Sequence, residues 1–184
     1  INNYVSNYND KIDVLPAPKD PRNAMKIDSK YIGLVITSAI YKYDVILIDT
    51  SHNISPISLT AVDKSDNTLF MVTNDPVDLK NARSMIAIFK DSDIENYKVV
   101  FNSSKDTGKD YFSLFDIRNI IKSNIDYTIS NSFYIKNIDK YVLNGEILTL
   151  NRNINRFHGK DVTKLKLIAE ALIKEEKGDM DEDE

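Results

Sequence analysis

The fold is decided by residues 43–89, which read YDVILIDTSHNISPISLTAVDKSDNTLFMVTNDPVDLKNARSMIAIF. This stretch contains two uninterrupted apolar runs, one at 45–48 and one within 68–73. Apolar runs that do not alternate with polar residues are typical of strands buried on both faces of a parallel sheet. The Asn-Asp-Pro sequence at 74–76 predicts that a helix begins after the second run, because a capping side chain is followed by proline in the first turn.

Strand and helix signals continue to alternate on either side of this stretch. Strands are predicted at 11–15, 43–49, 68–73, 97–101 and 127–135, and helices at 29–41, from 76 onward, at 113–125 and at 161–174. This alternation implies parallel crossovers, so we expect an α/β fold: a doubly wound, mostly parallel sheet with helices on both faces. We expect residues 1–176 to form one domain and the acidic residues 177–184 to form a disordered tail.

Composition limits the chemistry that the 184 residues can perform. The chain has no cysteine, which excludes disulfides and thiolate zinc sites, and its two histidines, His52 and His158, are too few for a histidine-rich metal site. The net charge is −4, and removing the five carboxylates of residues 179–184 would leave +1. A nearly neutral body lacks the broad basic face that duplex DNA usually requires. No apolar run approaches the ~20 residues that span a bilayer, so a cytoplasmic protein is expected.

Polar side chains follow the predicted strands at the ends where ligands bind in folds of this class. Asp49 ends the strand at 43–49, and its carboxylate suits Mg²⁺ beside a phosphate, since this cation takes oxygen ligands and keeps several waters. Taken alone, this carboxylate strongly suits capping of the next helix. The amide of Asn102 offers a donor and an acceptor to a nucleobase edge, or to local backbone in a turn. His52 has no evident partner in the sequence and is interpreted as a loop histidine.

The order of these segments resembles the later part of a MinD/ParA-type P-loop ATPase, in particular the CpaE/TadZ branch associated with pilus assembly and secretion. Residues 43–89 carry most of the resemblance: a strand ending in Asp49, a helix, a second strand at 68–73 and the sequence DLKNA at 78–82. The strand at 98–102, KVVFN, follows in the family's order. The resemblance covers about residues 11–175.

The resemblance implies a role for each candidate residue. Asp49 would be the Walker B carboxylate, which holds Mg²⁺ through water beside the phosphates of ATP, and Asn102 would bind the adenine edge. The switch loop, which senses the terminal phosphate, would consist of Thr50, Ser51, His52 and Asn53. The family also implies a homodimer, protein partners in a pilus or secretion apparatus, no direct contact with nucleic acid and no direct membrane insertion. The location would be cytoplasmic, with recruitment by partners to a cell pole or the inner membrane.

Two departures from the family pattern bear on function. The loop after Asp49 reads TSHN and lacks the prolines and glycine that are common there, and no glycine of the chain lies in the GxxxxGK[ST] setting of a phosphate-binding loop. The strand that precedes that loop is missing too. Because the first residue is Ile1, we expect the chain to be the C-terminal portion of a longer ATPase.

Two functions remain open. One is a nucleotide-dependent ATPase that positions a cellular apparatus, with ATP and Mg²⁺ as cofactors. The other is a non-catalytic relative that serves as an interaction or localisation module and binds no nucleotide. A phosphoacceptor receiver domain fits less well, since the segment KIDVLPAP at 11–18 offers only Asp13 where such a domain needs a cluster of acids.

Overall fold

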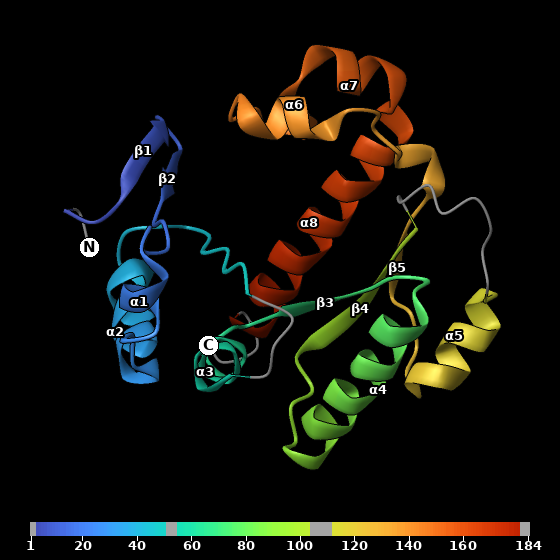
Figure 1. Ribbon diagram of the computed structural model, residues 1–184, viewed down its shortest axis with the longest axis horizontal. Coiled ribbons are helices and arrows are strands. Elements are labelled where there is room, and N and C mark those ends of the chain that lie inside the picture. The colour runs from blue at the N-terminus through green and yellow to red at the C-terminus, as the bar shows by residue number, and fades with distance from the viewer. Residues whose placement is uncertain (1–2, 51–54, 104–111, 181–184) are drawn as a thin grey trace. The chain divides into compact units, whose positions relative to one another are not determined.

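The computed structural model describes residues 3–50, 55–103 and 112–180 of the chain (Figure 1). The chain divides into two compact units, Ile1–Ser65 and Asp66–Glu184, and each is described by itself. The prediction of one domain over 1–176 stays a prediction. Among the described residues, no helix combines the length and apolar character that crossing a bilayer requires.

The first unit is a hairpin followed by three helices. Strands β1 (Ser6–Asn9) and β2 (Ile12–Val14) pair antiparallel, and helices α1 (Pro21–Ala24), α2 (Ser29–Ile40) and α3 (Pro56–Asp63) follow. The Asp28 side chain caps α2 by accepting from the backbone N–H of Lys30. Helices α2 and α3 pack on each other, and Ile36, Ala39 and Ala61 are buried in this unit.

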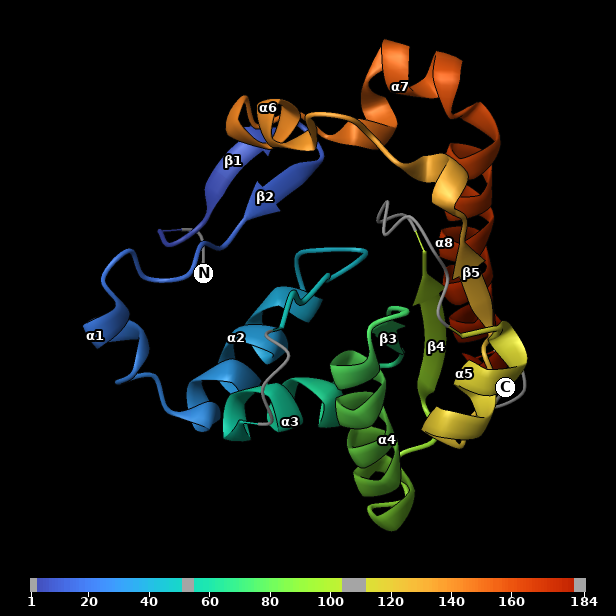
Figure 2. The ribbon, with the colours of Figure 1, turned by 45° about the vertical axis from the view of Figure 1, so that its right-hand side comes forward.

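The second unit contains a three-stranded parallel sheet in the order β3 (Thr68–Val72), β4 (Tyr97–Asn102) and β5 (Tyr127–Ile129). Helix α4 (Pro76–Asp91) connects β3 to β4, and α5 (Leu114–Ile121) lies between β4 and β5 in sequence. Helices α4 and α5 lie on one side of the sheet and α8 (Gly159–Met180) on the other (Figures 1 and 2). This confirms the predicted doubly wound α/β fold with a mostly parallel sheet and helices on both faces.

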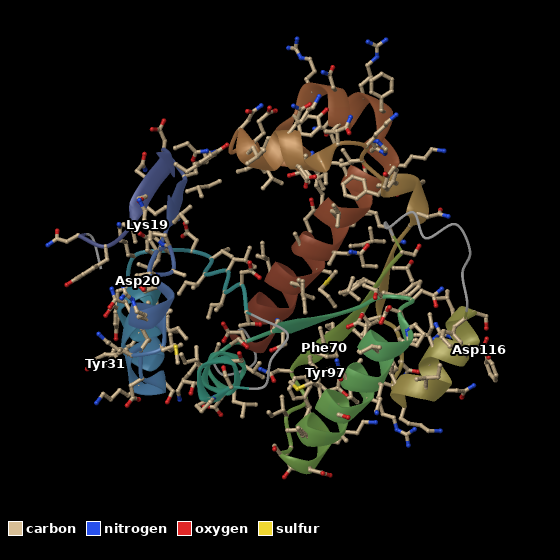
Figure 3. All side chains as sticks on the ribbon, in the orientation of Figure 1. Lys19, Asp20, Tyr31, Phe70, Tyr97 and Asp116 are labelled. Carbon is tan, nitrogen blue, oxygen red and sulfur yellow. The ribbon has the colours of Figure 1, made fainter. Side chains whose placement is uncertain are left out.

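The main core lies between the sheet and helices α4 and α5. Its buried members are Val72, Leu79, Ala82, Ile86, Val99, Phe101, Ile117, Ile121 and Ile125. The centroid of the Phe89 ring lies 5.8 Å from that of Phe70 and 5.2 Å from that of Tyr97. Phe70 belongs to β3 and Tyr97 to the neighbouring strand β4, and both are labelled in Figure 3. Val100 lies between the core residues Val99 and Phe101 of β4, so its side chain points to the opposite face of the sheet, and it is only 2% exposed. The middle strand is therefore buried on both faces, as its apolar run predicted.

A second apolar cluster lies where the chain leaves β5. It joins Ile135, Ile154 and Val162, and it involves helices α6 (Ile138–Leu143) and α7 (Arg152–Phe157) and two 3-10 turns, Asn131–Phe133 and Leu148–Leu150. Helix α8 is tied to the sheet by a 2.8 Å hydrogen bond from Lys164 Nζ to Thr128 Oγ1. It is described to Met180, which lies within the predicted acidic tail; residues 181–184 lie outside the described part of the chain.

The strand predicted at 43–49 is wrong for this structure. Residues 43–50 form neither strand nor helix, and Val45 and Leu47 are 63% and 91% exposed. A buried parallel strand needs a hydrogen-bonded neighbour on each edge, and no described residue pairs with this segment. The strand predicted at 127–135 is also shorter than expected, because the backbone turns into a 3-10 helix at Asn131.

Strand β3 is an edge strand of the sheet that the described residues form. Only β4 pairs with it among the described strands, and its five residues, TLFMV, include no charge and no proline. Leu69 and Met71, which alternate with the core residues Phe70 and Val72, remain partly exposed, at 39% and 38%. Among the described strands, the sheet therefore ends on this apolar strand.

Candidate functional site

The carboxyl ends of β3 and β4 form the rim where the fold places ligands. Val72 is paired in register with Phe101, so the next residue of each strand, Thr73 and Asn102, follows at the same edge. Asn102 is in turn opposite Ile129 of β5, and its side chain is half-buried. The structure therefore puts the predicted base-binding amide at the carboxyl end of the central strand.

The turn after β3 is held by carboxylates at the start of α4. Asp78 Oδ2 accepts from Thr73 N–H at 2.7 Å and from Thr73 Oγ1 at 2.8 Å. Asp75 caps the helix by accepting from the N–H groups of Val77 and Asp78 at 2.9 and 3.0 Å. Asp75 thus satisfies backbone donors that a helix start leaves unpaired, and Asp78 fixes the residue that follows β3. Both carboxylates therefore have a structural role at the rim.

The segment that enters α5 contacts the turn after β3. Asn74 Nδ2 donates to the Phe112 carbonyl at 3.3 Å, which links the turn after β3 to the segment entering α5. Ser113 and Asp116 then form a capping box, in which Asp116 Oδ2 accepts from Ser113 Oγ at 2.7 Å and from Ser113 N–H at 3.0 Å. The hydrogen bond from the Ser113 hydroxyl, followed by that from its backbone, lowers the pKa of Asp116, which Figure 3 labels on α5. Asp116 is therefore held as a carboxylate.

The other half of the predicted site belongs to the first unit. Asp49 and Thr50 are exposed and follow the irregular apolar segment 45–48. The remaining residues of the predicted switch loop, Ser51, His52 and Asn53, lie outside the described residues. Asp49 belongs to the first unit and Asn102 to the second, and their joint role stays a prediction.

The described residues fit a nucleotide only in part. Asn102 can meet a base edge and Asp49 can hold Mg²⁺ through water, but no group of three or more acidic or histidine side chains gathers within the described ranges. The chain also has no glycine-rich loop with a lysine whose backbone amides would cradle phosphates. These residues alone therefore do not suffice for Mg²⁺–ATP, and no step of its hydrolysis is assigned to them.

Sequence reasoning missed the pairing of Thr73 with Asp78. A threonine that ends a buried strand and an aspartate in the first turn of the next helix, five residues apart, are the signal that could have revealed it. Only the family resemblance implied a helix where α3 lies; its start was not predicted from the residues, although Ser55 and Pro56 carry the same kind of start signal as the beginning of α4.

Comparisons with known proteins identify the fold. No family model and no curated protein sequence matches the chain. The structure is similar to that of a ParA family ATPase from Chlorobium tepidum TLS, with a TM-score of 0.71 and 17% identity over 93% of this chain and 68% of that one. It is also similar to the MinD cell division protein of Aquifex aeolicus, with a TM-score of 0.60 and 22% identity over 85% and 64% of the two chains.

A second Aquifex aeolicus structure, the MinC:MinD cell division protein complex, gives a TM-score of 0.58 and 23% identity over 78% of this chain and 60% of that one. The chain thus spans between 60% and 68% of the length of these structures. The α/β architecture derived above is therefore the MinD/ParA-type, P-loop NTPase-like fold.

Proposed function

We propose that this chain is part of a MinD/ParA-like protein that binds ATP with Mg²⁺ and positions a cellular apparatus. The observation that carries the proposal is the parallel sheet β3–β4–β5, with Asn102 at its carboxyl end, in a fold shared with a solved ATPase. Ligands of open parallel sheets bind outside those ends. The narrower proposal is that the apparatus is a pilus or secretion assembly, as the CpaE/TadZ-like order of residues 43–89 suggests.

In this proposal each candidate residue keeps a defined role. Asn102 contacts the adenine edge, and Asp49 holds Mg²⁺ through water. Thr50, Ser51, His52 and Asn53 form the loop that senses the terminal phosphate. The complete protein forms a homodimer and meets protein components of the apparatus. In support, the MinD of Aquifex aeolicus is found in a complex with another protein, MinC. It is cytoplasmic and is recruited to its site by those partners.

The glycine-rich loop that would bind the phosphates is not among these 184 residues, and we propose that it lies in polypeptide outside them. Two observations support this. The chain spans only 60–68% of the matched structures, and β3 is an apolar edge strand among the described residues, beside which a further strand would fit. A strand there would cover Leu69 and Met71 and would bring its own carboxyl end to the rim that holds Asn102.

Calorimetric titration with Mg²⁺–ATP tests the proposal on the complete gene product. We expect binding by the complete protein and poor binding by the 184-residue chain. Asn102→Ala should weaken ATP binding about tenfold, the cost of about 1.4 kcal/mol in lost hydrogen bonds to the base. Asn124→Ala changes an exposed asparagine that precedes β5, at the opposite end of the sheet, and should leave the affinity unchanged.

Hydrolysis tests Asp49 separately. Asp49→Ala should abolish slow ATP hydrolysis by the complete protein, whereas the matched variant Asp44→Ala, an exposed aspartate at the start of the same segment, should retain it. Unchanged hydrolysis in Asp49→Ala would remove this residue from the mechanism.

The alternative is a non-catalytic interaction or localisation module that binds no nucleotide. It is favoured by the altered TSHN loop and by the absence of a phosphate-binding sequence among the 184 residues. It predicts no heat of binding at millimolar Mg²⁺–ATP even with the complete gene product. Clear Mg²⁺-dependent binding would reject it.

A further inference from the structure

Helix α2 is apolar on two faces, and only one of them is buried. Ile36 and Ala39 lie on the buried face. Tyr31, which Figure 3 labels on α2, is 50% exposed, and Leu34 and Tyr41 are 62% and 89% exposed. Single exposed apolar residues are ordinary on protein surfaces, but a helix that is apolar on more than one face is normally enclosed. The second face of α2 is therefore a candidate contact surface.

The exposed side chains of this face form a regular line along the helix. We call Tyr31, Leu34, Ser38 and Tyr41 the outer stripe of α2. At about 100° of rotation per residue, the four positions fall within a sector of about 80°, and the buried Ile36 lies on the opposite side of the helix. Tyr41 follows the last residue of α2, but its backbone angles, φ −77° and ψ −4°, continue the helical path. The spacing of three, four and three residues is that of the seam in a coiled coil.

The outer stripe can be covered without leaving a polar group unpaired. No residue from Tyr31 to Tyr41 carries a charge. The hydroxyl of Ser38 already donates to the carbonyl oxygen of Leu34 at 2.8 Å, so its donor is satisfied within the helix. The tyrosine hydroxyls lie at the far ends of their rings and can stay in water at the border of a contact while the rings are covered.

The charges on either side of the outer stripe are matched within the chain. Before it, Lys30 Nζ lies 3.9 Å from Asp28 Oδ2 and 5.2 Å from the centre of the Tyr31 ring. After it, Lys42 Nζ lies 3.1 Å from Asp13 Oδ2. The stripe and its borders therefore carry no net charge that would select an acidic or a basic partner. A partner has to be selected by shape and apolar area.

The spacing of the outer stripe fits a second copy of the same chain. Tyr31 and Tyr41 lie five residues before and after Ile36, and Leu34 and Ser38 lie two residues before and after it. Reversing the helix about Ile36 therefore lays the stripe on itself. In an antiparallel pair, each Tyr31 meets Tyr41 of the other copy. Each large Leu34 side chain meets a small Ser38, which lets the two helices approach closely.

We propose that the outer stripe of α2 is a self-association face, through which two copies of the chain pair as antiparallel helices about a two-fold axis. One patch then serves both copies, as in most homodimers. The contact is short, because ten residue steps advance a helix by only about 15 Å, and it stays below the ~1,200 Å² at which stable protein interfaces begin. The dimer is therefore weak and reversible. It needs no nucleotide and does not rest on the proposed function.

Sedimentation velocity of the 184-residue chain, without nucleotide, tests this proposal. We expect the mean sedimentation coefficient to rise from that of a monomer to that of a dimer as the concentration increases from micromolar to millimolar. Leu34→Glu should raise the dimer dissociation constant at least about tenfold, because it brings a charge into an apolar contact. The matched control Ile40→Glu changes a side chain of similar exposure, 60% against 62%, on another side of α2 and should leave the constant unchanged.

Two further controls make the result specific to α2. Each variant is also measured with Leu69→Lys, which excludes pairing through the edge strand β3. Unchanged circular dichroism shows that each variant is folded. The proposal is overturned if the chain stays monomeric up to millimolar concentration, or if Ile40→Glu weakens the dimer as much as Leu34→Glu does. Failure of ATP binding in the complete protein would leave this result untouched.

Cysteine cross-linking tests the antiparallel register, since the chain has no cysteine of its own. In the proposed pair, the two copies of residue 31 are about 15 Å apart along the helix axis, whereas residue 31 of one copy lies beside residue 41 of the other. A mixture of Tyr31→Cys and Tyr41→Cys chains should therefore form a disulfide under mild oxidation that neither chain forms alone. Equal cross-linking of Tyr31→Cys with itself would reject the antiparallel pair.

Discussion

The hydroxyl of Tyr43 donates a hydrogen bond of 2.6 Å to Oδ2 of Asp13, thirty positions away in the sequence. Lys42 Nζ donates to the same oxygen at 3.1 Å, and Asn7 Nδ2 donates to the other carboxylate oxygen at 3.1 Å. The ammonium of Lys42 also lies 4.7 Å from the centre of the Tyr43 ring. These contacts fasten the β1–β2 hairpin to the residues after α2, so the segment leading to Asp49 starts from a fixed point.

This network makes a pH dependence testable. Hydrogen bonds from Tyr43, then Asn7 and Lys42, lower the pKa of Asp13 from 3.8 to about 2. Since the folded-state pKa lies below the unfolded value, the ionised carboxylate stabilises the fold above about pH 4, and this contribution is lost as the pH falls through about 2. Asp13→Asn should therefore be less stable than the unmodified chain at pH 7, with the difference shrinking towards pH 2. Urea unfolding followed by circular dichroism at several pH values measures it, with Asp10→Asn of the same hairpin as the control.

Helix α4 offers a paired test of the main core. Leu79 is fully buried against the sheet, whereas Val77, two residues earlier, is 66% exposed. Leu79→Ala should lower the free energy of unfolding by about 2–5 kcal/mol, because it removes buried methyl groups and leaves a cavity. Val77→Ala should change it by less than about 0.5 kcal/mol. Equal effects of the two substitutions in denaturant unfolding would contradict the packing of α4 described here.

The contact between Thr73 and Asp78 can be tested by two substitutions at one position. Asp78→Ala should cost about 1–3 kcal/mol, because it leaves the backbone N–H of Thr73 without its acceptor and removes a negative charge from the start of α4. Asp78→Asn keeps an oxygen acceptor and should restore part of that loss. Thermal unfolding of the unmodified chain and of both variants measures these differences. If all three proteins unfold at the same midpoint temperature, the hydrogen bonds to Asp78 contribute nothing to stability.

A further prediction separates this chain from the proposed complete protein. Leu47 is 91% exposed here, so Leu47→Ser should change the stability of the 184-residue chain by less than about 0.5 kcal/mol. In a polypeptide whose additional strand completes the sheet, residues 45–48 would become a buried strand, and the same substitution should cost about 2–4 kcal/mol. If the cost stays small in the complete protein, the proposed sheet completion is wrong.

Elements with local signals could be predicted from the sequence. Helix α4 follows from the Asn-Asp-Pro sequence at 74–76, and β4 follows from an apolar run that both faces of the sheet bury. Asn102 at the end of β4 could be placed for the same reason, since a strand's end follows from its run. That Asn102 binds the adenine edge stays a prediction.

The segment 45–48 shows where such prediction fails. Its sequence, VILI, has the apolar character of a buried strand, but a strand is defined by hydrogen bonds to neighbours that its own residues do not specify. The short helices α6 and α7 were missed for a related reason. Each has only six residues, too few to show a helical period, and tertiary packing around Ile154 holds them in place.

The place of β3 at the edge of the described sheet also has a consequence for handling the chain. The strand consists of five consecutive uncharged residues, with no lysine or proline, and its register with β4 contains no bulge, so it lacks the features that deter pairing with another molecule. Two copies meeting edge to edge would extend one continuous ladder, so concentrated samples of the isolated chain should self-associate and precipitate. The substitution Leu69→Lys, at a partly exposed position of this strand, would act as a gatekeeper and keep the sample monodisperse.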